Sequence, residues 1–326
     1  MSTQSNSPQD HYYNPRLDSK LYLEGPLSAN PATRLRQMLA RPGIIVAPGI
    51  SDGISVRCAL EAGFNCLYQG GAATTASRLG QPDLAIATLN DFVDAARVNC
   101  SIDRTVPVIA DADTGFGGPG NVARTVDQYI MAGVAGMHIE DQVQAKRCGH
   151  LMGKQVVSRE EFVTRIRAAV NARDSVPGGS DFVIIARTDA VQAEGLDEAV
   201  IRMKLAVKAG ADVCFIEAVS KEELRQITKA LDPTPILVNS VPTGTPEPSI
   251  TYQEAEALGA KIIIFPSLSS FAIARAVREA MQSLKQFGSD FHIANGMKPK
   301  SFFELMGLNE IVEIDAKAGG TALQGV

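Results

Sequence analysis

The chain has 326 residues, of which 45% are hydrophobic and 21% charged, a composition typical of a folded globular protein with one or two domains. A net charge of -5 at pH 7 without any strongly basic stretch argues against a nucleic-acid partner. The five cysteines form no CxxC pair, and this odd number indicates reduced thiols, so we expect a cytoplasmic protein. The first thirty residues contain no apolar run long enough for a signal peptide or membrane helix, and we expect no membrane partner.

Residues 1–33 are polar and are predicted to form an N-terminal arm, which either packs on a neighbouring subunit through Tyr12, Tyr13 and Tyr22 or has no fixed structure. After the arm, short runs rich in Val and Ile alternate with amphipathic stretches. The runs predict eight strands, at residues 44–49, 66–70, 107–113, 136–141, 182–189, 213–218, 236–241 and 262–266. Eight such units favour a single (β/α)8 barrel domain at residues 34–287, since an open α/β sheet usually has fewer strands.

Several helix boundaries are also visible in the sequence. Ser158 and Ser220 each begin a capping-box pattern with a glutamate three residues later. Four glycines follow helical patterns and precede the next strand, where a left-handed residue usually ends a helix: Gly63, Gly133, Gly210 and Gly259.

In a barrel of this kind, functional residues lie where the strands end. The predicted strand ends carry polar or charged residues, namely Gln69, Gly70, Gly71, Asp111, Asp113, Glu140, Asp141, Arg187, Asp189, Glu217, Asn239, Ser240 and Ser267. For Asp189 and Ser267, a solvated loop or a helix cap is an equally good interpretation. Because charge is costly to bury, charged residues at the ends of four strands predict a functional site at this face.

Three of these carboxylates point to a metal. Asp111, Asp113 and Glu140 offer hard oxygen ligands without His or Cys at zinc spacing, which predicts Mg2+, or alternatively Mn2+, held by one or two carboxylates and several waters. The alternative is that they cap helices or pair with Arg187. Residues 115–120 (GFGGPG) match a dinucleotide-binding pattern, but two adjacent carboxylates would repel a pyrophosphate, so we interpret this segment as a supple loop near the metal.

Cys148 lies among Lys146, Arg147 and His150, whose charges favour the thiolate, and nearby glycines predict a mobile loop. As a nucleophile it would need an acyl-type substrate; beside a hard metal ion it could instead give a proton to an enolate. The spacing leaves both roles open. The other cysteines lie in helical or strand patterns and are predicted to be packed structural thiols: Cys58, Cys66, Cys100 and Cys214.

Residues 34–286 resemble the isocitrate lyase and phosphoenolpyruvate mutase superfamily. The resemblance rests on residues 74–83 (TTASRLGQPD), 111–117 (DADTGFG), 138–142 (HIEDQ), 146–150 (KRCGH) and 186–189 (ARTD). It implies a (β/α)8 barrel with Mg2+ ligated by Asp111 and, largely through water, by Asp113 and Glu140. It also implies a mobile loop carrying Cys148 as general acid. The cysteine motif marks the lyase branch, because the phosphonate mutases and hydrolases lack it.

The resemblance further implies that a 2-hydroxy dicarboxylate, malate- or methylisocitrate-like, is split between C2 and C3 into a 2-oxo acid and a carboxylate enolate, which Cys148 protonates. Arg187 would bridge the substrate carboxylate and the oxyanion, as its forked donors suit. Tyr68 matches a family tyrosine that could accept the hydroxyl proton, although a packed strand aromatic is an equal interpretation. The other implied contacts to substrate come from Gly70, Gly71, Ala72, Asp83, Lys146, Gly149, His150, Glu217, Asn239 and Ser240.

Three departures from the family pattern bear on the substrate. Gly70 replaces a usual Ser or Thr, and residues 240–244 (SVPTG), which include Pro242, are closer to the mutases. Pro266 stands where oxaloacetate-cleaving members have a serine, which favours a lyase similar to dimethylmalate or methylisocitrate lyases over an oxaloacetate acetylhydrolase. A metabolite-binding relative that has lost turnover is a further alternative.

Residues 288–326 form a predicted C-terminal extension. The segment 299–306 (PKSFFELM) has an apolar face too large for a lone terminal helix to expose. In relatives a C-terminal helix is exchanged between the subunits of a dimer within a tetramer, so the resemblance implies a subunit-swapped homotetramer, a dimer of dimers.

Overall fold

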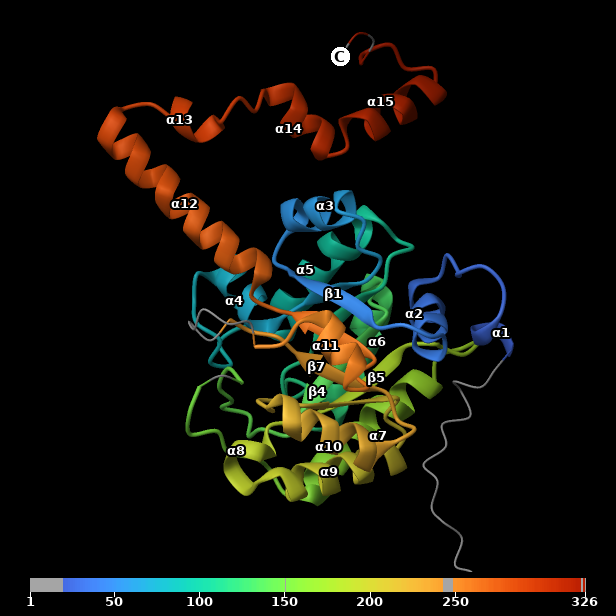
Figure 1. Cartoon of the computed structure of the whole chain (residues 1–326). Helices are drawn as coiled ribbons and strands as arrows, with labels where there is room; N and C mark the ends of the chain where they lie inside the picture. The colour runs from blue at the N-terminus through green and yellow to red at the C-terminus, as the bar shows by residue number, and fades with distance from the viewer. Residues whose placement is uncertain (1–19, 150, 243–248, 324, 326) are drawn as a thin grey trace, which may run out of the picture.

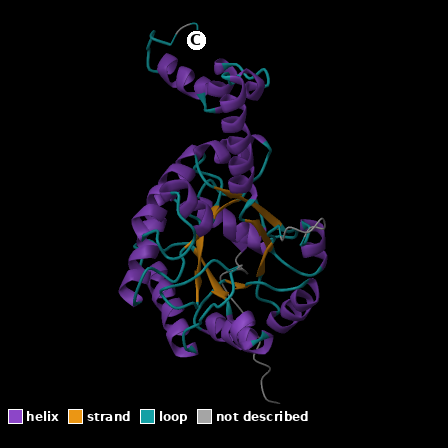
Figure 2. Cartoon of the chain, turned by 90° about the vertical axis from the view of Figure 1, so that its left-hand side faces the viewer, coloured by secondary structure: helices purple, strands orange, loops and turns teal. Residues whose placement is uncertain are grey.

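The computed structural model describes residues 20–149, 151–242, 249–323 and 325. Eight parallel strands pair in chain order, and β8 pairs with β1 to close the barrel. Figure 2 shows this ring of strands surrounded by helices. The strands are β1 (Ile45–Ile50), β2 (Leu67–Gln69), β3 (Val108–Asp111), β4 (Gly136–Glu140), β5 (Val183–Thr188), β6 (Val213–Ile216), β7 (Ile236–Asn239) and β8 (Ile262–Phe265). The predicted (β/α)8 fold and all eight strands are therefore confirmed.

The helices surround the barrel and continue beyond it (Figure 1). They are α1 (Lys20–Leu23), α2 (Pro31–Ala40), α3 (Gly53–Glu61), α4 (Gly71–Leu79), α5 (Leu89–Ile102), α6 (Pro119–Ala132), α7 (Arg159–Asp174), α8 (Ala190–Glu194), α9 (Leu196–Lys208), α10 (Lys221–Leu231), α11 (Tyr252–Ala257), α12 (Leu268–Phe287), α13 (Phe291–Ala294), α14 (Pro299–Leu305) and α15 (Leu308–Lys317). Ser220 forms the predicted capping box at the start of α10. Ser158 caps α7, but the Glu161 carboxylate pairs with Arg165.

The four glycines predicted at helix ends all adopt positive φ, between +85° and +103°. Two glycines of the 115–120 segment are also required, but for packing: a Cβ on Gly115 would lie 2.5 Å from Val122, and one on Gly117 would lie 2.0 Å from Asn121. Both have positive φ, which favours glycine. These contacts explain the glycines as features of the loop that leads into α6.

The period of two along each strand divides the apolar side chains between two cores. Strand β5 illustrates the alternation: Val183 and Ile185 belong to the core inside the barrel, whereas Ile184 and Ala186 belong to the core beneath the helices. Leu35 and Leu39 of α2 join the inner core, so α2 packs against the amino-terminal end of the barrel.

A buried ion network fixes α2 to the strands above it. The Arg36 guanidinium is fully buried and lies 3.1 Å from Asp212, which also pairs with Arg173 at 2.7 Å. Asp212 additionally accepts the Ile184 N–H. Burial alone would raise the pKa of Asp212, but the two guanidinium groups outweigh it and hold that pKa below its ordinary value.

The described part of the N-terminal arm packs on its own chain. Tyr22 is buried, and its hydroxyl donates to Asp181 at 2.5 Å. Tyr12 and Tyr13 lie outside the described residues. Among the described residues, no helix is both long and apolar enough to cross a membrane.

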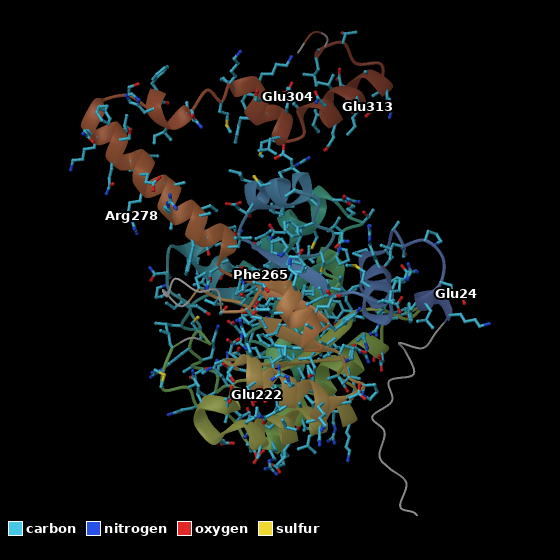
Figure 3. The ribbon with its side chains drawn as sticks, viewed as in Figure 1. Glu24, Glu222, Phe265, Arg278, Glu304 and Glu313 are labelled. Atoms are coloured by element: carbon cyan, nitrogen blue, oxygen red, sulfur yellow. The ribbon has the colours of Figure 1, made fainter. Side chains whose placement is uncertain are left out.

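The C-terminal helices extend away from the barrel, as Figure 1 shows for α12 to α15. Arg278, Glu304 and Glu313 lie on these helices outside the barrel, whereas Phe265 lies within it (Figure 3). No described residue of α12 is buried, and its exposed large apolar side chains are Leu268, Phe271, Ile273, Val277, Met281, Leu284 and Phe287. An exposed apolar face of this size is typical of a subunit contact.

One cysteine prediction is wrong. Cys66, Cys100 and Cys214 are buried as predicted, but Cys58 is exposed on α3. The same helix buries Val56 against the barrel, and Cys58 lies on its outer face. Cysteine is usually buried, but a helical pattern alone does not say which face of the helix turns toward the core.

Candidate active site

A cavity of about 320 Å3 opens at the carboxyl ends of the strands. Eleven of the predicted site residues line it: Tyr68, Gly70, Gly71, Ala72, Asp83, Asp111, Cys148, Gly149, Arg187, Glu217 and Asn239. A larger groove of about 840 Å3 lies against α6 and α7, but Asp127 is the one charged residue among the described residues that line it. The strand-end cavity is therefore the candidate active site.

Asp111 at the end of β3 anchors one wall of the cavity. Its carboxylate accepts the N–H groups of Gly71 and Asp113, each at 2.9 Å. A Cβ on Gly71 would lie 2.8 Å from Asp111 Oδ2, so only glycine lets the backbone approach this closely. Burial opposes ionisation of Asp111, but the His138 ring, Lys146 and Arg187 outweigh it and lower its pKa to about 2.

Lys146 sits between two of the predicted carboxylates behind the cavity wall. Its ammonium nitrogen lies 2.5 Å from Asp83 and 2.6 Å from Asp113. Asp113 has a positive φ of +43°, which turns its carboxylate toward this position. Burial raises the pKa of Asp113 to about 7, although Lys146 acts in the opposite direction.

Arg187 at the end of β5 is the hub of the charged groups. It donates to both oxygens of Asp189, at 3.0 and 3.2 Å, and lies 3.1 Å from Glu140 and 3.6 Å from Glu217. Burial works against its charge, but these carboxylates outweigh it and raise its pKa well above the ordinary value. Its guanidinium also lies over the Phe215 ring, 5.2 Å from the centroid. The arginine is therefore charged and rigidly oriented.

The loop that carries Cys148 lies between the bridged residues Gln142 and Val156 and is called the cysteine loop below. It packs directly onto Arg187. A Cβ on Gly149 would lie 2.6 Å from Arg187 Nη2, and the Cys148 N–H donates to the Asp83 carbonyl at 3.1 Å. Cys148 is partly exposed and lines the cavity. The loop thus stands in a closed position, with the thiol on the wall of the cavity that holds Arg187.

Tyr68 lies at the base of the cavity, with its hydroxyl 2.8 Å from His138 Nε2. Burial raises the pKa of Tyr68 well above its ordinary value, and it lowers the pKa of His138 to about 4. At neutral pH the pair is therefore a phenol beside a neutral imidazole. Such a phenol is suited to hydrogen bonding, and it would accept a proton only at a large cost.

Some predicted residues are placed elsewhere. The Ser240 hydroxyl donates to the Ile250 carbonyl at 2.9 Å, and this residue does not line the cavity. Asp113, Glu140 and Lys146 lie behind the wall rather than on it. His150 lies outside the described residues, as do residues 243 and 244 of the SVPTG segment.

Sequence reasoning assigned no site role to two buried side chains that the structure brings to this region. Lys154 is buried and pairs with Asp189 at 2.8 Å, and His138 occupies the barrel interior beside Tyr68. The HIEDQ segment contained His138, so the strand alternation that points it inward was the available signal. Lys154 carried no comparable signal, because its partner is distant in sequence.

The site fits a divalent cation. Six carboxylates (Asp83, Asp111, Asp113, Glu140, Asp189 and Glu217) gather around three cations (Lys146, Lys154 and Arg187). The buried oxygens Asp113 Oδ1 and Glu140 Oε2 pair with Lys146 at 2.6 Å and with Arg187 at 3.1 Å. Among the described residues no three His, Cys, Asp or Glu side chains converge closely enough to hold an ion by themselves. This agrees with an ion that takes one direct ligand and keeps several waters, as Mg2+ does.

Fold and site together define a (β/α)8-barrel protein with a carboxylate-rich, arginine-centred site beneath a cysteine loop. The phosphoenolpyruvate phosphomutase family model matches residues 35–285. The chain is 40% identical over 289 residues to 2,3-dimethylmalate lyase from Eubacterium barkeri, covering 88% of this chain and 97% of that one. It therefore belongs to the phosphoenolpyruvate mutase/isocitrate lyase superfamily.

Solved structures give the same result. A crystal structure of 2,3-dimethylmalate lyase matches with a TM-score of 0.86 and 49% identity, covering 91% of this chain and 98% of that one. Oxaloacetate acetylhydrolase bound to the inhibitor 3,3-difluorooxalacetate matches with a TM-score of 0.86 and 47% identity, covering 90% and 99%. Phosphonopyruvate hydrolase in complex with oxalate and Mg2+ matches with a TM-score of 0.76 and 29% identity, covering 89% and 98%.

Proposed function

We propose that this chain is a magnesium-dependent carbon–carbon lyase that splits a 2-hydroxy dicarboxylate between C2 and C3 into a 2-oxo acid and a carboxylate. The observation that carries the proposal is the position of Cys148 on the cavity wall, on a loop packed against Arg187 and Glu217. A thiol placed there can protonate a carbanion formed in the cavity. The likeness to 2,3-dimethylmalate lyase supports the same reaction class.

Four residues of the cavity have separate roles in the proposed reaction. Arg187 lines the cavity with fixed, charged donors that suit a substrate carboxylate and the oxygen on which negative charge develops. Ala72 lines the cavity in the first turn of α4, where its N–H has no acceptor within the helix and is available to a substrate carboxylate. Tyr68 is placed to hydrogen-bond the reacting 2-hydroxyl, whose proton passes to a carboxylate of the cavity as the C2–C3 bond breaks, and Cys148 gives its own proton to C3 of the carboxylate enolate.

Asp111 would hold the Mg2+ ion, with Asp113 and Glu140 reaching it through water. When bound, the ion supplies positive charge that lowers the pKa of a chelating 2-hydroxyl group. The excess of carboxylates over cations around Asp111 supports this assignment. Mn2+ is expected to substitute, because it accepts the same oxygen ligands.

The cavity lining supports a small dicarboxylate with alkyl substituents. Among the described residues that line it, Arg187 is the one cation. The lining residues that follow position 240 are mostly apolar, namely Val241, Pro266, Phe271 and Ala274. A third substrate carboxylate would meet no further cation there, so a dimethylmalate-like substrate suits the cavity better than a methylisocitrate-like tricarboxylate.

Oxaloacetate acetylhydrolysis, giving oxalate and acetate, is the second candidate because of the 47% identity to the acetylhydrolase structure. Pro266 lines the cavity and weighs against it, because the family resemblance implies a serine at this place in oxaloacetate-cleaving members. A binding protein without turnover is the third candidate.

The test is an assay of 2-oxo acid and oxalate release from 2,3-dimethylmalate, 2-methylisocitrate and oxaloacetate with Mg2+. Wild type, Cys148→Ser and the matched control Cys58→Ser are compared, since Cys58 is an exposed thiol outside the site. We expect turnover of dimethylmalate, lost by at least about a hundredfold in Cys148→Ser and unchanged in Cys58→Ser. Efficient oxalate release from oxaloacetate would favour the acetylhydrolase, and ligand binding with no turnover would refute the lyase.

The exposed apolar face of α12 supports a homotetramer in which C-terminal helices pack on neighbouring subunits. We place this protein in the cytoplasm on the strength of its reduced cysteines. Sedimentation velocity that shows only a monomer at micromolar concentration would contradict the tetramer.

A further inference from the structure

Lys154 lies on the part of the cysteine loop that leads back to the barrel, two residues before Val156. Its side chain is buried but does not line the cavity. The loop rises from an antiparallel bridge between Gln142 and Val156. Burial of a lysine is costly unless its ammonium is paired and hydrogen-bonded. Lys154 satisfies this condition through two partners that belong to different parts of the fold.

The first partner lies on the loop and the second on the barrel. The Lys154 ammonium donates to the Gly149 carbonyl at 2.8 Å and to Asp189 at 2.8 Å. Asp189 follows β5, and its side chain is fully buried. One ammonium therefore connects the residue beside Cys148 to the rigid end of a barrel strand.

Asp189 is also the carboxylate that orients Arg187. It accepts from Arg187 Nε and Nη2, while Lys154 approaches its Oδ1 atom. Opening the loop would remove Gly149 and so deprive Lys154 of an acceptor. The position of the loop and the setting of the arginine fork are thus joined through one carboxylate.

We propose that Lys154 is a positioning residue that latches the cysteine loop over the cavity and couples its closure to Arg187. The effect of this latch on turnover rests on the lyase reaction proposed above, whereas its effect on loop opening does not. Lys154 itself touches no reacting atom. It holds the Gly149 carbonyl next to Cys148, and its second partner, Asp189, also accepts from Arg187.

The latch can be measured without turnover, because the closed loop hides a trypsin site. The Arg147 side chain is exposed, but the N–H after its scissile bond, that of Cys148, is held by the Asp83 carbonyl at 3.1 Å. Cleavage at Arg147 therefore requires the loop to open. Alkylation of Cys148 by iodoacetamide, followed on its own peptide in a Cys58→Ser background, reports the same opening.

Lys154→Met should speed cleavage after Arg147 and alkylation of Cys148 by at least about tenfold, and Lys154→Arg should restore most of the protection. Lys221→Met is the matched control, because it removes an exposed ion pair with Glu254 far from the loop. In turnover, Lys154→Met should lower kcat by about a hundredfold with a much smaller change in KM. If Lys154→Met fails to fold, Lys154→Gln tests the same ion pair.

Wild-type cleavage and alkylation rates in Lys154→Met, or an equal rise in Lys221→Met, would overturn the latch. The proposed function fails separately. If the wild type turns over none of the dicarboxylates while Lys154→Met still exposes the loop tenfold, the latch holds and the lyase assignment falls.

Discussion

Replacing Gly149 by alanine should disable the site without unfolding the protein. A Cβ at this position would lie 2.6 Å from Arg187 Nη2 and 2.8 Å from Glu217 Cδ, whereas ordinary contact begins at 3.4 Å. The arginine cannot yield easily, because Asp189 and Glu140 hold it through three donor atoms. The loop must instead rise by at least about 0.8 Å, and a displacement near 1 Å costs about a hundredfold in rate.

The measurement is kcat/KM for Gly149→Ala with the substrate that the wild type prefers. Gly120→Ala is the matched control, because a Cβ there meets nothing within 4 Å. A hundredfold loss corresponds to about 2.7 kcal/mol of transition-state stabilisation. Thermal unfolding should remain close to that of the wild type, since the change opens only a surface loop. Activity within about threefold of the wild type would refute the closed loop as the catalytic form.

The remaining predictions concern stability, metal binding and the substrate loop. Asp212→Asn should cost about 3–5 kcal/mol in urea unfolding, because it leaves two buried guanidinium groups poorly paired, whereas Glu254→Gln at an exposed pair should change the stability far less. Mg2+ affinity in calorimetric titrations should fall about tenfold per pH unit below pH 7, because Asp113, with its pKa raised to about 7, must lose its proton; a flat profile from pH 6 to 8 would contradict this. Gly70→Ser should lower kcat/KM by a few-fold, since its Cβ would lie 3.0 Å from Tyr68, and improved binding would contradict this.

The barrel was predictable because its signals are local. Each strand is a short apolar run, and helix caps such as Ser220 and turn glycines such as Gly133 mark the boundaries between units. The convergence of the strand ends then follows from topology, since all eight strands are parallel in a closed barrel. For this reason the sequence alone predicts that Asp111, Arg187 and Glu217 lie at one face, and all three line the cavity.

The contacts that hold the site together were not predictable in the same way. Lys154 finds Asp189 across 35 residues, and Tyr68 finds His138 across 70. No spacing rule connects such pairs, because their distance depends on how neighbouring strands and the loop pack. Ser240 shows the opposite case. Its position at a strand end predicted a substrate contact, but its hydroxyl donates to the backbone carbonyl of Ile250.

The environment of Cys148 shows why neighbours in sequence are a poor guide to electrostatics. Lys146 precedes the thiol by two residues, yet its ammonium is held by Asp83 and Asp113. The Arg147 guanidinium donates to the Met152 carbonyl at 2.9 Å and is exposed to solvent. Both cations are thus engaged by groups other than the sulfur. The positions of Lys146 and Arg147 beside the thiol in the sequence therefore did not predict where their charges lie.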